Sequence, residues 1–241
     1  MPRVKPQRPI LDKNHPLARG LVLDLPFTEM GGDVLDISGH ENNGVRAATG
    51  SQYQIGRYGP CLYLDSLNSG PVGDMANDGI PITGSDFWTI SIILEAKTIN
   101  PLGSEYAIYE RNSIASRATF LLGWSKFGEA VIAFTDDAGV GFGDGTGSGV
   151  VKIGVPLAVT VTSSKRQGNL YIDGALNTPF DYSSLGVMTP DIYWIGHDGW
   201  YPMNGFIHSN RAWNRALTAQ EVASLYVDPW QIYQNFHKQE E

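Results

Sequence analysis

The chain has 241 residues, of which 42% are hydrophobic and 17% are charged, and these proportions favour a folded core over disorder. Its formal net charge of −8 argues against a nucleic-acid partner, because a general nucleic-acid binder needs a basic surface to displace phosphate counterions. The 28 glycines and 14 prolines, which follow no triplet period, predict many turns between short strands.

Residues 1–16 are predicted to form an extended arm. The arm carries four basic side chains, Arg3, Lys5, Arg8 and Lys13. Two interpretations are open: a solvated terminus, or an anchoring arm that orders on a neighbouring subunit. No apolar stretch follows the basic residues, so we expect no signal peptide. No apolar run approaches the ~20 residues that span a bilayer, so we expect no membrane partner.

Short apolar or alternating runs predict about ten β-strands along the chain. The clearest run is 87–96, where Trp88, Ile90 and Ile92 share one face, while Thr89 and Ser91 lie on the other. The expected strands cover residues 21–25, 61–64, 87–96, 106–109, 119–124, 130–135, 157–162, 169–176, 192–195 and 206–213.

Three local features qualify this pattern. Asp173 and Gly174 predict a tight hairpin turn within 169–176, because a type I′ turn needs positive φ at both central positions. Segment 139–149 alternates glycine with other residues and no helix follows it, so we interpret it as a flexible surface loop rather than a phosphate-binding loop. Cys61 is the sole cysteine, and its apolar neighbours predict a buried thiol.

One helix is expected near the C-terminus. Thr218 and Glu221 form a capping box that begins the helix, and Asp228 before Pro229 ends it. The tail, residues 229–241, is rich in apolar side chains and is expected to pack on its own domain or on a partner. Between the arm and the tail, residues 17–228 are predicted to form a single β-sandwich of two antiparallel sheets.

Five motifs carry a family resemblance. They are DISG followed by NNG in 36–44, GPCLYLD in 59–65, FWTIS in 87–91, LYIDG in 170–174 and NRALTAQEV in 214–222. Their order within residues 17–228 resembles the laminin-G-like jelly rolls of the concanavalin A-like lectin/glucanase superfamily. The resemblance implies an all-β, two-sheet antiparallel jelly-roll sandwich with one short C-terminal helix.

Two segments near the N-terminus and one near the C-terminus resemble variants of this fold that tailed bacteriophages encode. They are residues 1–6, 15–22 and 225–230. That resemblance implies a virion protein made in the host cytoplasm. A head decoration protein bound to the major capsid protein or another virion protein is expected, with its copies associating, for example as trimers. The alternative is a lectin or adhesin module of a tail or fibre that binds a cell-surface glycan. A degenerate glycosidase is the third candidate.

The sequence lacks the carboxylates that glycoside hydrolysis requires. Relatives with that activity place E-x-D-x-x-E on one strand, and their acid and base must lie about 5 to 9 Å apart. Asp136 and Asp137 are adjacent, so in extended backbone their side chains diverge, and a turn role explains them better. The G-x-S-x-G, H-E-x-x-H and P-loop motifs are also missing. We therefore expect no enzymatic activity.

The resemblance also implies a calcium ion between the DISG loop and an acidic pair in the last long strand. Asp36 and Asn42, or Asn43, are the candidate ligands in the loop. His208 and Ser209 stand where relatives have the acidic pair, which removes charge that Ca²⁺ prefers. Asp36 is thus either a calcium ligand or a plain turn residue, and we expect no other cofactor.

The loop 196–204 is the candidate for glycan contact. On such sandwiches an aromatic ring stacks on the sugar, while polar side chains bind its hydroxyls. The residues that fit these roles are His197, Asp198, Trp200 and Tyr201. The same side chains also suit contact with a neighbouring subunit or local packing, and these alternatives are open.

Overall fold

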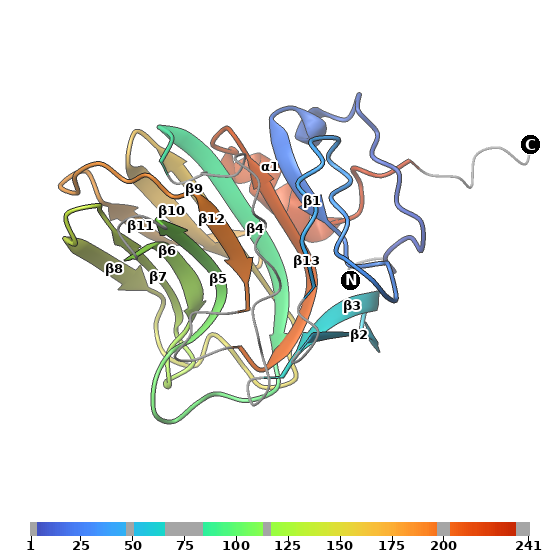
Figure 1. The fold of residues 1–241 in the computed structure, drawn as a ribbon, viewed down its shortest axis with the longest axis horizontal. Coiled ribbons are helices and arrows are strands. Elements are labelled where there is room, and N and C mark those ends of the chain that lie inside the picture. The colour runs from blue at the N-terminus through green and yellow to red at the C-terminus, as the bar shows by residue number, and fades with distance from the viewer. Residues whose placement is uncertain (1–3, 47–50, 66–83, 113–116, 197–202, 235–241) are drawn as a thin grey trace, which may run out of the picture.

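Two antiparallel sheets face each other across a single core (Figure 1). The computed structural model describes residues 4–46, 51–65, 84–112, 117–196 and 203–234. The elements found there are η1 (Pro16–Ala18), β1 (Leu21–Leu25), β2 (Ser51–Gly56), β3 (Gly59–Leu64), β4 (Phe87–Ala96), β5 (Glu105–Asn112), β6 (Arg117–Trp124), β7 (Ala130–Thr135), β8 (Gly141–Gly145), β9 (Leu157–Ser164), β10 (Gln167–Ile172), β11 (Ala175–Asp181), β12 (Ile192–Ile195), β13 (Gly205–Trp213) and α1 (Ala219–Val227).

The larger sheet has the strand order β11-β10-β9-β4-β13-β3-β2. Strand β13 is central to it, because its second edge is shared by two strands. The first part of β13 pairs with β3, from Gly205 to Ile207, and the second part pairs with β1, from Asn210 to Trp213. The smaller sheet has the order β12-β5-β6-β7-β8. The all-β, two-sheet prediction is therefore confirmed.

Two strands were not expected from the sequence. Strand β2 pairs with β3, although its residues show no clear alternation of apolar side chains. Strand β8 lies within 139–149, so the prediction of a flexible loop is wrong for Gly141–Gly145. These residues pair with β7 at the edge of the smaller sheet. Backbone hydrogen bonds form the pairing, so a glycine-rich segment can join a sheet without an apolar pattern.

The inner faces of the sheets form the main core. Trp88, Ile90 and Ile92 of β4 are fully buried in it, as the alternation predicted. The hairpin prediction is also confirmed, because Asp173 and Gly174 have φ values of 51° and 79° between β10 and β11. Closely packed rings fill the core opposite β4, and the stacked pair Phe134 and Tyr182 has centroids 4.3 Å apart.

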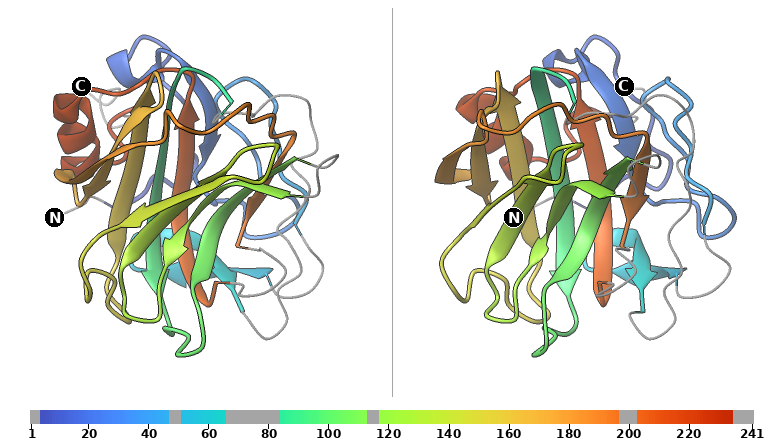
Figure 2. Two further views of the ribbon diagram at one scale, coloured as in Figure 1. Left: turned by 90° about the vertical axis from the view of Figure 1, so that its left-hand side faces the viewer. Right: turned by 60° about the vertical axis from the view of Figure 1, so that its left-hand side comes forward.

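Helix α1 covers the upper part of the larger sheet on its outer face (Figure 2). Its capping box is present as predicted, with the Thr218 hydroxyl accepting from the Glu221 amide. Val222 and Leu225 are the buried side chains of the helix, and they pack in an outer cluster with Ile93 of β4. No helix in the described part of the chain has the length and apolar character needed to span a membrane.

The arm and the tail pack on the same outer face and pair with each other. Leu11 forms an isolated bridge with Tyr233, and both are buried. For residues 229–234 the structure therefore decides between the two predicted partners of the tail: it packs on its own domain. The outer cluster includes Leu11, Leu17, Trp230, Ile232 and Tyr233.

Lys5 corrects the interpretation of the arm. Its side chain is 2% exposed, and its Nζ donates hydrogen bonds to the carbonyls of Pro26 and Pro60 within the same chain. Lys5 is therefore neither solvated nor available to anchor a neighbouring subunit, and both interpretations are wrong for this residue. Burial lowers the pKa of its ammonium to about 7. Arg8 and Lys13 are exposed, and Arg3 lies outside the described residues.

A buried ion pair joins β13 to β1 and the tail. Arg211 is 2% exposed, and its Nε donates to Asp24 Oδ1 at 2.8 Å. Its other nitrogens donate to the Pro229 carbonyl at 2.7 Å and to the Tyr233 hydroxyl at 2.8 Å. Burial raises the pKa of Asp24, and the charge and hydrogen bond of Arg211 oppose that rise.

We predict that Asp24→Asn destabilises the protein by about 3–5 kcal/mol, because it leaves the Arg211 charge buried without a counter-ion. Chemical denaturation at neutral pH measures this loss. Asp144→Asn on the edge strand β8 is the matched control, and its cost is expected to stay below about 1 kcal/mol. Equal costs for the two variants would contradict the central role of the pair.

Candidate functional site

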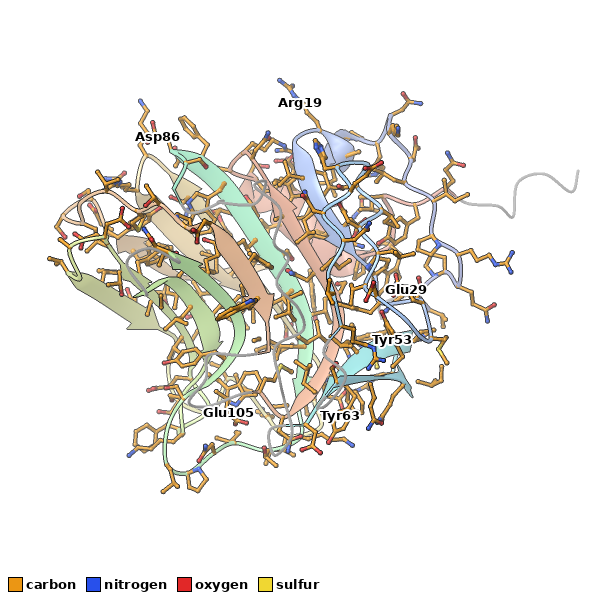
Figure 3. The ribbon with its side chains drawn as sticks, viewed as in Figure 1. Arg19, Glu29, Tyr53, Tyr63, Asp86 and Glu105 are labelled. Carbon is orange, nitrogen blue, oxygen red and sulfur yellow. The ribbon has the colours of Figure 1, made fainter. Side chains whose placement is uncertain are left out.

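Four side chains lie side by side across four strands of the larger sheet, on its outer face. Gln52 pairs with Tyr63, Tyr63 pairs with Phe206, and Phe206 pairs with Glu95. Directly paired residues of neighbouring strands point to the same face, so the four form one continuous row. We call this row the aromatic strip. Tyr63 marks its place at the lower end of the molecule in Figure 3.

Strand alternation turns the two rings of the strip outward. Leu62 and Leu64 are fully buried in the core, so Tyr63 between them points away from it. Ile207 is buried in the same way and leaves Phe206 on the outer face. The two rings are half-buried, with centroids 5.3 Å apart and planes inclined by 50°. Together they offer an apolar surface.

Polar groups lie around this surface. Lys97 is exposed, and its Nζ lies 4.9 Å from the centroid of the Tyr63 ring and 4.8 Å from that of Phe206. These distances allow a cation–π interaction, and the long side chain can move its ammonium to a ligand group. The Tyr63 hydroxyl donates to Asn204 Oδ1 at 3.4 Å, which places an amide at the rim.

Glu105 holds the backbone beneath this rim. Its buried carboxylate accepts hydrogen bonds from Trp124 Nε1 at 2.7 Å, from the Asn100 amide at 2.9 Å and from the Asn204 amide at 3.3 Å. Burial raises the pKa of Glu105, and these hydrogen bonds oppose the rise. Glu105 lies at the same lower end as Tyr63 (Figure 3). It therefore positions Asn204 and is itself enclosed.

Two buried side chains border the strip on its upper side. The ring of His208 lies 5.0 Å from that of Tyr58, and its Nε2 is 3.7 Å from Glu95 Oε2. Burial lowers the pKa of His208 to about 3, so the ring is neutral at physiological pH. Burial raises the pKa of Cys61 to about 11, which keeps the thiol protonated. The predicted buried thiol is thus confirmed.

The strip suits a ligand that has both an apolar face and hydroxyl groups. The rings of Tyr63 and Phe206 provide a surface for C–H groups. The Gln52 amide both donates and accepts hydrogen bonds, the Glu95 carboxylate accepts them and the Lys97 ammonium donates them. Sites for small ligands usually combine an apolar surface with a few polar groups around it.

A family model described as the concanavalin A-like lectin/glucanases superfamily matches residues 79–223, which is more than half of the chain. The chain belongs to this superfamily. The match includes the expected motifs at 87–91, 170–174 and 214–222, whereas those at 36–44 and 59–65 lie before it. No curated protein matches the sequence at a significant level.

Solved structures share the concanavalin A-like fold with this chain. The binding domain of Paraclostridial Mosquitocidal Protein 1 is 19% identical, with a TM-score of 0.67 over 87% of this chain and 52% of that one. Trypanosoma rangeli sialidase is 18% identical, with a TM-score of 0.65 over 89% of this chain and 34% of that one. This chain thus spans less than two thirds of either structure.

A third solved structure matches over almost its whole length. Domain 4 of AbnA, an extracellular arabinanase from Geobacillus stearothermophilus, is 13% identical to this chain. The TM-score is 0.63, and the alignment covers 86% of this chain and 98% of that domain. At such low sequence identity, these three similarities establish only that this chain shares their fold.

The loop expected to contact a glycan or a subunit begins and ends beside the strip. At its start, a Cβ on Gly196 would lie 2.2 Å from Leu64 Cδ1, so this glycine packs directly on the residue after Tyr63. At its end, Asn204 accepts from the Tyr63 hydroxyl. The role of the loop stays a prediction, because residues 197–202 lie outside the described part of the chain, and these include all four predicted contact residues, His197, Asp198, Trp200 and Tyr201.

Asp36 organises the loop that follows β1. Its Oδ1 accepts from the amides of Asp24 and Ser38, each at 2.9 Å. Its Oδ2 accepts from the Ser38 hydroxyl at 2.7 Å and the Asn42 amide at 3.0 Å. Asn42 in turn donates its Nδ2 to the Val22 carbonyl at 2.8 Å. These bonds agree with the interpretation of Asp36 as a turn residue.

The same residues do not fit a calcium ion. Both carboxylate oxygens of Asp36 already accept hydrogen bonds, and Ca²⁺ needs six to eight oxygen ligands. His208 and Ser209, at the second expected position, are buried and supply no carboxylate. Across the described ranges, no three His, Cys, Asp or Glu side chains lie close enough together for a metal ion.

Asp136 and Asp137 act in turn structure. Asp136 accepts from the amides of Val140 and Gly186, both at 2.8 Å, and these bonds lower its pKa. Asp137 Oδ2 accepts from the Thr189 hydroxyl at 2.7 Å. The two acids therefore hold loops together at the end of β7, as the sequence interpretation proposed.

Sequence reasoning did not identify the aromatic strip. Tyr63 and Phe206 were assigned to strands without a surface role. A signal was present, because each ring stands between residues that point into the core, so strand alternation places the ring on the outer face. The signal could not show that the two rings are adjacent, since they are 143 residues apart in sequence.

We predict that Asp36→Ala costs about 2–4 kcal/mol of stability, because the backbone amides of Asp24, Ser38 and Asn42 lose their acceptor. The melting midpoint of the parent protein is expected to be the same in Ca²⁺ and in chelator. Asp33→Ala, an exposed change in the same loop, is the control with a small expected cost. A higher midpoint in Ca²⁺ that Asp36→Ala abolishes would restore the calcium interpretation.

Proposed function

We propose that this chain is a non-catalytic carbohydrate-binding module and that the aromatic strip is its sugar-binding surface. The observation that carries the proposal is the outward-facing pair Tyr63 and Phe206, joined across paired strands and flanked by Gln52, Glu95 and Lys97. Sugar rings have apolar C–H faces and polar edges, so they match this arrangement.

Two further observations support the proposal. The aligned AbnA domain was solved in complex with arabinotriose, so a domain of this fold and size binds a sugar oligomer. The structural roles of three acidic side chains support the absence of catalysis. Glu105 is enclosed, and Asp136 and Asp137 use their oxygens to hold loops.

The test is binding to a broad glycan array, followed by titration of the best ligand. Tyr63→Ala and Phe206→Ala are each expected to weaken binding about tenfold, because each removes half of the stacking surface. Phe87→Ala is the matched control, since this ring is 42% exposed at the opposite end of β4. The Phe87→Ala variant should bind the glycan with the same affinity as the parent protein.

Two results would overturn the proposal. One is that no glycan on a broad array binds the folded parent protein. The other is that the Phe87 variant loses as much affinity as the Phe206 variant, which would place the sugar elsewhere.

As a second candidate, we propose that the module decorates a bacteriophage head. The observation that favours a surface for a partner protein is a group of exposed apolar side chains on three loops at the lower end. Leu102 is 82% exposed, Phe127 62% and Ile153 60%. Gly128 connects these loops, because a Cβ there would lie 3.5 Å from Ile99 Cδ1 and 2.8 Å from the Val151 carbonyl. Apolar loop tips of this kind suit a protein interface.

Replacing Leu102, Phe127 and Ile153 with serine should abolish co-purification with virions if this candidate is right, because the apolar contact is lost. Glycan binding should remain. The matched control replaces Leu176, Val187 and Val227, which are 56%, 65% and 70% exposed elsewhere on the surface. If the parent protein is absent from purified particles, the decoration candidate is wrong.

A further inference from the structure

A polar groove lies at the opposite end of the molecule from the aromatic strip. It is lined by Lys13, Asn14, His15, Arg19, Asn214 and Arg215. Figure 3 labels Arg19 at this upper end. The groove shares Lys13 and Asn214 with a second hollow that reaches His40. The arm therefore forms one wall of a concave surface. The other wall includes Asn214 and Arg215, which directly follow β13.

Hydrogen bonds within the chain hold this wall in place. His15 caps η1 by accepting the Leu17 amide on Nδ1 at 3.2 Å, so the proton of the neutral ring is on Nε2. Arg215 Nε donates to the Arg19 carbonyl at 2.8 Å, which ties the end of η1 to the segment after β13. Trp213 Nε1 donates to the Leu17 carbonyl at 2.7 Å.

The two carboxylates at the groove already accept hydrogen bonds within the chain. Glu221 Oε1 accepts from Arg215 at 2.7 Å, and Oε2 accepts from Arg215 at 3.0 Å and from the Thr218 amide at 2.8 Å. Asp12, next to the groove, accepts the Asn14 amide at 3.0 Å. The negative charge of Glu221 is thus paired with Arg215.

Two cationic side chains of the groove have no such partner in the described part of the chain. Lys13 and Arg19 are exposed, and within the described residues neither charged group makes an ion pair or a hydrogen bond. The Nε2 hydrogen of His15 adds a neutral donor. Three cations, Lys13, Arg19 and Arg215, and one carboxylate, that of Glu221, thus line a groove on a chain whose net charge is −8. The groove is complementary to an oxyanion, which supplies charge and several acceptors.

We propose that this groove binds an oxyanion, phosphate or sulfate, either free or carried as an ester on a saccharide, through Lys13 and Arg19. Arg215 acts as a positioning residue, because its own donors are committed to Glu221 and to backbone carbonyls. The site is independent of the aromatic strip, so a failure of one proposal does not affect the other.

The test titrates the full chain with two probes, inorganic phosphate and a heparin-derived tetrasaccharide, at constant ionic strength with chloride as the reference anion. Backbone amide shifts in NMR spectra locate the binding, and calorimetry measures the tetrasaccharide affinity. Saturable shifts are expected around residues 13–20 and 214–215. Binding of phosphate indicates a site for the free anion, and binding of the tetrasaccharide alone indicates that the anion is carried on a saccharide.

The double variant Lys13→Ala/Arg19→Ala is expected to weaken binding of whichever probe binds at least tenfold, since it removes both charged donors. The control Lys126→Ala/Lys152→Ala makes the same change in net charge with two lysines that are also exposed, and its affinity should stay within twofold. The proposal is overturned if neither probe gives saturable shifts at the groove, or if the control variant loses as much affinity as the double variant.

Discussion

The pair of Arg211 and Asp24 is the interaction on which the outer half of this protein depends. Burying two charges is costly, and hydrogen bonds to both partners offset part of that cost. Asp24 Oδ1 accepts from Arg211 and from the Tyr233 hydroxyl, whereas Oδ2 has no hydrogen-bond partner among the described residues. Here the guanidinium binds a carboxylate of β1, a carbonyl of the tail and the Tyr233 hydroxyl. One side chain of β13 thereby ties β1 and the tail together, and the arm packs on the tail through Leu11.

This cover divides the outer face of the larger sheet into two regions. Helix α1, the arm and the tail enclose its upper part, which lets polar strand residues such as Thr89 and Ser91 become buried. The lower part keeps Tyr63 and Phe206 half-exposed. An aromatic surface therefore remains where the cover ends. At the opposite end of the molecule, residues 13–16 of the arm line the polar groove.

Most acids that looked notable in the sequence serve structure. Asp36, Asp136 and Asp137 each accept several hydrogen bonds from loops. Glu105, which the sequence did not single out, supports Asn204 below the strip in the same way. A carboxylate engaged in this way is poorly suited to bind a metal or move a proton. Among the described residues, Lys13 and Arg19 at the groove and the outward side chains of the aromatic strip are the groups that a ligand can reach.

The sequence by itself determined the two-sheet fold, the alternation of β4, the Asp173-Gly174 turn and the capped helix. The last three depend on residues close together in the chain, so local patterns predict them. The two-sheet fold followed from the number of short strands and from the order of the family motifs. Only the tertiary structure decided that Gly141–Gly145 joins a sheet, that Lys5 is buried, and that Tyr63 lies beside Phe206. These features arise from contacts between segments far apart in sequence. Strand order and packing fix such contacts, and a linear pattern contains no information about them.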